Sequence, residues 1–94
     1  MSHSIRVSKL AAHAIGCLDE PRRRELIEQV DQIASEPAQW LRRLASGGLP
    51  PGLWVHTFSS QETPGVMVSI FIEWALGENA PLTIVSVTDR LGDA

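Results

Sequence analysis

The sequence is poor in cysteine and has no segment of membrane-spanning length. Only one of its 94 residues, Cys17, is a cysteine, so an internal disulfide is excluded. Cys17 lies in a helical apolar pattern, and we expect a buried thiol in a reducing compartment rather than a reactive one. No apolar run reaches the ~18 residues of a membrane helix, and the first residues lack the apolar stretch of a signal peptide. These absences predict a cytoplasmic protein that does not associate with membranes.

Positive charge is also scarce. Lysine and arginine together number 8 against 11 aspartates and glutamates, which gives a formal net charge of −3. The chain as a whole therefore has no positive field that would draw it to nucleic acid. No pair of histidines, cysteines or carboxylates has a recognisable metal-ligand spacing, so we expect neither a metal site nor a cofactor.

The first part of the chain has the pattern of two helices. Ser4–Ser8 alternates polar and apolar residues and predicts a short strand. Ser8 is then placed to cap a helix that runs through Leu18, and Asp19 to cap a second one. Glu36-Pro37 ends the second helix, because the residue before proline is disfavoured in the α conformation.

The second part alternates with a period of two. Three runs, Leu53–Phe58, Val66–Trp74 and Leu82–Asp89, are separated by turn residues and predict the strands of an antiparallel meander. The fold class that follows is α+β, with two N-terminal helices packed on one face of a small twisted antiparallel sheet. A length of 94 residues predicts a single domain, 1–94, with one core.

The two continuous apolar surfaces of the chain are expected to pack on each other. The pattern predicts that four sheet residues meet four helix residues: Val68, Ile70, Ile72 and Ile84 against Leu10, Leu26, Val30 and Ile33.

The other face of the sheet is left uncovered by this arrangement. We expect Met67 and Phe71 to lie there, beside Trp54, His56 and Phe58 if the register of the hairpin allows it. An exposed patch of large apolar groups usually marks an interface, so Phe58, Met67 and Phe71 are predicted to bind a partner chain or a second copy.

His56 is the best candidate for proton transfer, because imidazole titrates near neutral pH. Trp54 and Phe58 flank it at i±2 and could stack on bases, as aromatic residues of RNA-binding sheets do. The alternative is a partly exposed histidine packed between two aromatic side chains. Sequence alone leaves both interpretations open.

Two groups of arginines differ in their surroundings. Arg22–Arg24 begin a helix among acidic residues, which favours a solvated, neutralised helix start over a phosphate site. Arg42 and Arg43 lie beside Trp40 and a Gly-Gly loop, and are the better candidates for phosphate contacts.

The order strand, helix, helix, basic loop and three-strand meander resembles the RelE/ParE toxin superfamily. The resemblance covers nearly the whole chain through short motifs at four places: Val7-Ser8-Lys9-Leu10-Ala11, Glu36-Pro37, Leu44-Ala45-Ser46-Gly47-Gly48-Leu49-Pro50-Pro51-Gly52-Leu53-Trp54 and Val87-Thr88-Asp89-Arg90.

The resemblance implies the toxin component of a type II toxin–antitoxin pair that inhibits growth, with an antitoxin-like partner. Some members of the superfamily cleave mRNA on the ribosome. For such an activity here, His56 and Arg90 would be the catalytic residues, and Arg42, Arg43 and Trp54 would bind RNA.

The sequence departs from the superfamily in its chemistry. RNA-cleaving members use several basic residues and usually a C-terminal tyrosine, whereas this chain has no tyrosine. The strand that commonly carries Tyr-Arg-Val reads Val66-Met67-Val68-Ser69-Ile70 here, without a basic residue. A second hypothesis therefore stands beside the toxin, namely a non-catalytic protein-interaction module with a toxin-like fold.

Overall fold

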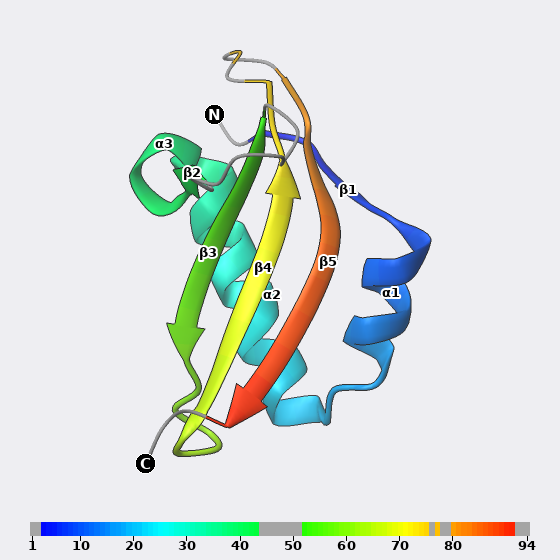
Figure 1. The fold of residues 1–94 in the computed structure, drawn as a ribbon, viewed down its shortest axis with the longest axis vertical. Helices are drawn as coiled ribbons and strands as arrows, with labels where there is room; N and C mark the ends of the chain where they lie inside the picture. Colours follow the sequence, from blue (N-terminus) through cyan, green and yellow to red (C-terminus); the bar gives the residue numbers. More distant parts are fainter. Residues whose placement is uncertain (1–2, 44–51, 76, 78–79, 92–94) are drawn as a thin grey trace.

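One sheet holds every strand of the protein that the computed structural model describes, in the order β1-β5-β4-β3-β2. The structure describes residues 3–43, 52–75, 77 and 80–91. Figure 1 shows the elements in chain order: β1 (Ile5–Val7), α1 (Lys9–Gly16), α2 (Glu20–Ser35), α3 (Pro37–Trp40), β2 (Arg42–Arg43), β3 (Leu53–Ser59), β4 (Val66–Glu73) and β5 (Leu82–Leu91).

The pairing of the strands confirms the predicted fold class, with one difference at the edge. β3, β4 and β5 form the predicted antiparallel meander. β1, however, lies beside β5 and is parallel to it, with Ile5 opposite Leu82. The sheet is therefore mixed rather than wholly antiparallel, because the first strand of the chain joins the last one.

The first helix begins as predicted and ends early. The Ser8 hydroxyl accepts a hydrogen bond from the Ala11 amide (3.0 Å) and donates one to the Val85 carbonyl (2.7 Å). α1 stops at Gly16, and Cys17 follows it as an exposed residue. The expected burial of the Cys17 thiol is therefore wrong, because the helical pattern does not continue through that position.

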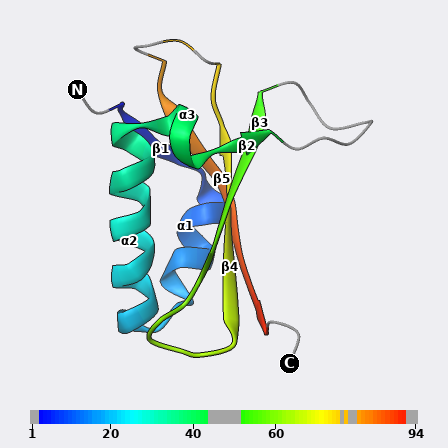
Figure 2. The ribbon, with the colours of Figure 1, turned by 90° about the vertical axis from the view of Figure 1, so that its left-hand side faces the viewer.

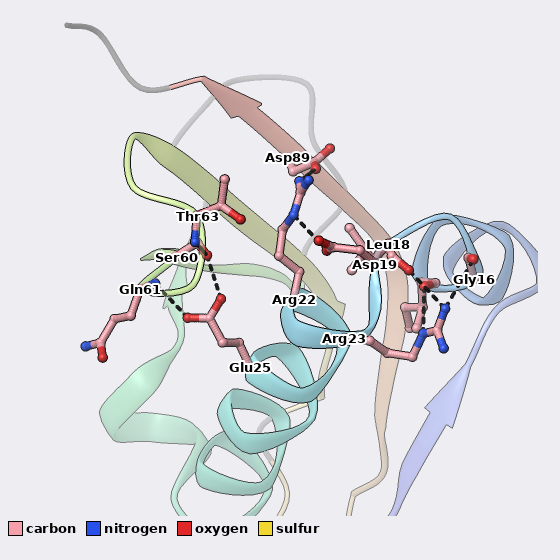
Figure 3. A network of polar contacts seen from close by, with 11 residues as sticks. Gly16, Leu18, Asp19, Arg22, Arg23, Glu25, Ser60, Gln61, Thr63 and Asp89 are labelled. Atoms are coloured by element: carbon pink, nitrogen blue, oxygen red, sulfur yellow. Dashed lines mark hydrogen bonds and ion pairs between the residues drawn. The ribbon is translucent and has the colours of Figure 1, made fainter.

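Ion pairs neutralise Arg22 and Arg24 at the start of α2, as their acidic neighbours predicted, whereas Arg23 donates to backbone carbonyls at the end of α1 and after it. Arg22 pairs with Asp19 (3.0 Å) and with Asp89 of β5 (2.6 Å), while Arg24 pairs with Glu20 (2.8 Å). The Asp19 side chain makes no capping hydrogen bond. Figure 3 shows how Arg22 ties the first turn of α2 to the end of β5.

The core lies between the sheet and the two longer helices, which cover the same face (Figure 2). The four sheet residues predicted for the core, Val68, Ile70, Ile72 and Ile84, are buried, as are Leu26 and Ile33 of α2. Val30 is half-buried against this core. Leu10 is 65% exposed, so its predicted burial is wrong. Ala11, the next residue of α1, is fully buried in its place.

A bulge in β5 changes the predicted faces of that strand. The register against β4 shifts at one step, so that Val85 has no partner residue there. An extra residue reverses the alternation that follows it. Ser86 was expected to share a side with Ile84, but Val87 turns toward the helices instead and is buried.

Candidate functional site

The register of β3 against β4 decides which predicted site residues share a face. Three residues of β3 lie opposite the buried residues of β4: Trp54 pairs with Ile72, His56 with Ile70 and Phe58 with Val68. Side chains directly opposite in a sheet project from the same face. Trp54, His56 and Phe58 therefore lie on the side of the helices.

Met67 and Phe71 lie on the other side of the sheet, opposite Ser59 and Val55. The register of the hairpin therefore does not allow the expected grouping with Trp54, His56 and Phe58. The predicted alternation within each strand was correct. Which residues of two neighbouring strands share a face depends on the register between the strands, and the connection sets that register. A shift of the register by one residue moves every side chain of a strand to the other face.

We call this second side the open face, because no described helix lies over it (Figure 2). Its centre is partly apolar, with Val55, Met67 and Phe71 each half-buried. Serine and threonine separate these residues; the hydroxyls of Thr57 and Ser69 lie 3.0 Å apart across β3 and β4. An uncovered surface of this kind suits a macromolecular contact.

Three exposed arginines lie around the open face. Arg42 is opposite Val55, Arg90 is opposite Met67, and Arg6 of β1 is opposite Thr83. None of the three forms an ion pair with any residue that the structure describes. From strand spacing, Arg42 and Arg90 are roughly 20 Å apart, since three strand intervals and four residues separate them.

The sequence analysis identified Arg42 and Arg90 as candidate functional residues, but it did not identify Arg6. Arg6 reaches this face only because β1 pairs with β5, a long-range contact for which the local sequence has no signal. For Arg43, the structure places the backbone opposite Trp54 at the edge of the sheet.

His56 is held between the sheet and the helices. Its Nδ1 lies 3.3 Å from the Trp40 carbonyl oxygen and its Nε2 lies 2.8 Å from the side-chain amide of Gln29. The ring is stacked on Phe58, at 6.0 Å between centroids, and meets the Trp40 ring edge-on. Burial lowers the pKa of His56, and the hydrogen bond to the Trp40 carbonyl opposes that shift in part.

This environment favours a neutral imidazole. The Trp40 carbonyl can only accept a hydrogen bond, so Nδ1 carries the proton and donates it. The structure places the side-chain oxygen of Gln29 next to Nε2. A half-turn of the amide would present its nitrogen there instead, which is the arrangement that a neutral ring with its proton on Nδ1 requires. Both ring nitrogens are thus engaged within the protein.

Trp54 is likewise packed against the core, on the helix side of the sheet. Its Nε1 donates to the Trp74 carbonyl (3.1 Å), and the two indole rings are 5.6 Å apart. On this face Trp54 cannot stack on a base that lies over Arg42 or Arg90.

A pocket of about 530 Å³ lies at the edge where α3, β2 and β3 meet. Its lining brings Arg42 and His56 together and includes four further residues: Gln39, Trp40, Val55 and Thr57. Arg90 lies away from it, on the other face from His56 and beyond β4. Arg90 therefore does not share a site with His56, whereas Arg42 and His56 line the same pocket.

Comparisons with known proteins support the fold. No family model matches the chain, and no curated protein sequence does. Among solved structures, a chain in the crystal structure of the toxin-antitoxin complex RelBE2 from Mycobacterium tuberculosis matches, with a TM-score of 0.73. The match has 14% sequence identity and covers 96% of this chain and 100% of that one. The protein has the fold of a toxin–antitoxin component.

Two further searches of the described residues were negative. No helix among them is long and apolar enough to cross a bilayer. No group of three or more histidine, cysteine or acidic side chains there is arranged to hold a metal ion.

Proposed function

We propose that this chain is the toxin-like component of a type II toxin–antitoxin pair, a diverged relative of the RelE/ParE toxins that acts in the cytoplasm. The observation that carries the proposal is the match of nearly the whole chain to a component of the RelBE2 complex. The open face supplies a surface on which such a protein would bind its antitoxin or its target.

The proposed action is inhibition of growth by binding rather than by acid–base catalysis. His56 is the best proton-transfer candidate among the predicted residues, and its two nitrogens are engaged by Trp40 and Gln29 on the helix side of the sheet. Arg42 and Arg90 would instead fix the orientation of a bound macromolecule through ionic contacts on the open face.

Controlled expression of the chain in a bacterial host tests this function. Growth should slow on induction and recover when the adjacent reading frame is expressed with it. Arg90→Glu combined with Phe71→Asp should relieve the inhibition, whereas His56→Gln, on the other face, should retain it in soluble protein. Normal growth on expression of the folded chain would contradict the toxin proposal and favour the interaction module.

Ribosome-dependent cleavage of mRNA is the second candidate, and the shared face of Arg42 and Arg90 favours it. Two cations on one face suit a phosphate backbone. The test is primer extension on mRNA from purified, translating ribosomes incubated with the protein. New 5′ ends that disappear with Arg42→Ala would support cleavage, and intact mRNA during growth arrest would support inhibition by binding.

A further inference from the structure

The outer edge of β3 presents unpaired backbone groups. The Trp74 amide donates to the Gly52 carbonyl (2.9 Å) and the Ser60 amide donates to the Val66 carbonyl (2.8 Å). Hydrogen-bonded pairs alternate along an antiparallel ladder, and the register between β3 and β4 has no irregularity. The even-numbered residues of β3 therefore bond to β4, and the odd-numbered ones point their N–H and C=O groups outward.

Only part of this edge is covered. β2 pairs with Val55 through Arg42 and with Trp54 through Arg43, and the chain before it turns away into α3. Thr57 and Ser59 remain, both exposed, and none of the hydrogen bonds among described residues uses their backbone groups. Two donors and two acceptors at a two-residue spacing match the edge to which an added strand binds.

A negatively charged hollow adjoins the free edge on the helix side. It has a volume of about 190 Å³ and is lined by residues of α2, β3 and the β3–β4 connection, among them Glu25, Glu28, Phe58 and Glu62. Glu25 is occupied, because it accepts hydrogen bonds from the Ser60 hydroxyl and the Gln61 amide. Glu28 and Glu62 have no ion pair with described residues, so a cation would find two carboxylates there.

We propose that an extended segment of a partner polypeptide adds to the sheet along β3, antiparallel to it, with a lysine or arginine opposite Phe58. The backbone of Thr57 and Ser59 would hold the segment. A side chain opposite Phe58 projects toward α2, where the carboxylates of Glu28 and Glu62 would receive its charge. The inference concerns the sheet edge rather than the open face, and it does not depend on the proposed function.

A seven-residue peptide of alternating valine and threonine with a central lysine is the probe. Titrated into isotope-labelled protein, it should shift the backbone amide signals of Thr57 and Ser59 and slow their hydrogen exchange. N-methylation of the peptide amides that face β3 should abolish binding, while N-methylation of the alternate amides should leave it within about twofold, because only the former bond to the edge. This comparison leaves the fold of the protein untouched.

Charge reversal tests the hollow. A central glutamate in the peptide should weaken binding at least about tenfold, and Glu28→Lys in the protein should reverse the preference. Asp31→Lys, at an exposed position of α2 outside the hollow, is the matched control and should leave the preference unchanged.

Two results would overturn the proposal. One is binding that is equally sensitive to both N-methylation patterns, because the edge would then not be the contact. The other concerns hydrogen exchange of the Thr57 and Ser59 amides in the protein without peptide. If this exchange is slow and becomes slower as the protein concentration rises, a second copy of the chain occupies the edge. Growth assays do not enter this test, so its failure is distinguishable from failure of the toxin proposal.

Discussion

Among the residues that the structure describes, His56 is one whose protonation depends on the fold. Burial lowers the pKa of its imidazole below the ordinary value of 6.5. In the unfolded chain the ring takes up its proton at a higher pH than in the folded protein. The contribution of His56 to the free energy of unfolding should therefore be constant above about pH 6.5 and should fall as the pH drops through that value. Urea unfolding at about pH 7.5 and about pH 5.5 should show a larger loss for the wild type than for His56→Gln.

The amide of Gln29 offers a control for this pH dependence. Gln29→Glu has nearly the same shape but places a carboxylate against Nε2, which stabilises the imidazolium and should raise the pKa of His56. NMR signals of the His56 ring, followed as the pH is changed, measure the pKa of this residue in the wild type and in Gln29→Glu. A wild-type pKa at or above the ordinary value would show that burial does not govern the protonation of this ring.

At the scale of single elements, β4 carries the largest part of the core. Ile70 is fully buried at its centre, so Ile70→Ala should lower the free energy of unfolding by about 2–5 kcal/mol. Thr88→Ala, at an exposed position of β5, is the control and should stay within ~0.5 kcal/mol of wild type. Chemical denaturation measures both. Near-equal midpoints for wild type and Ile70→Ala would place the core elsewhere.

The β3–β4 connection is fixed to α2 by a buried hydroxyl. The Ser60 hydroxyl donates to Glu25 (2.6 Å) and accepts from the Thr63 amide (3.0 Å), as Figure 3 shows. Ser60→Ala removes a hydrogen-bond partner from the Glu25 carboxylate and from the Thr63 amide. It should lower the free energy of unfolding by about 1–3 kcal/mol. Gln61→Ala keeps the backbone amide that binds Glu25 and should be close to neutral. Equal stability of the two variants would mean that water replaces the lost hydroxyl.

The same elements show what a sequence can and cannot predict here. The alternation along β4 correctly separated Ile70 from Phe71, because strand geometry imposes a period of two on each strand alone. The residues that lie opposite them on β3 and β5 depend on the register that each connection sets and on a bulge at Val85. No local sequence pattern reveals either of these. His56 was therefore recognised as a candidate but assigned to the wrong face.

For the whole molecule, the open face predicts weak self-association when no partner is present. Sedimentation velocity at rising concentration should show growing association of the wild type, because partly apolar residues of this face would meet in a second copy. Phe71→Asp should keep the protein monomeric. Ile27→Asp is the control, because Ile27 is 54% exposed on α2, away from this face. An unchanged profile for Phe71→Asp would exclude the open face as the contact.

The parallel pairing of β1 with β5 also constrains how the protein is made. The strand beside the N-terminus finds its neighbour only when β5 is present, and the Ser8 hydroxyl that begins α1 bonds to Val85, 77 positions further along. Contacts of such separation are slow to form because a long loop must close first. A nascent chain that stops before Leu82 has neither the docking strand for β1 nor the central support of α1. For the proposed toxin, prematurely terminated products would therefore lack the completed sheet, and activity would wait for synthesis of the last strand.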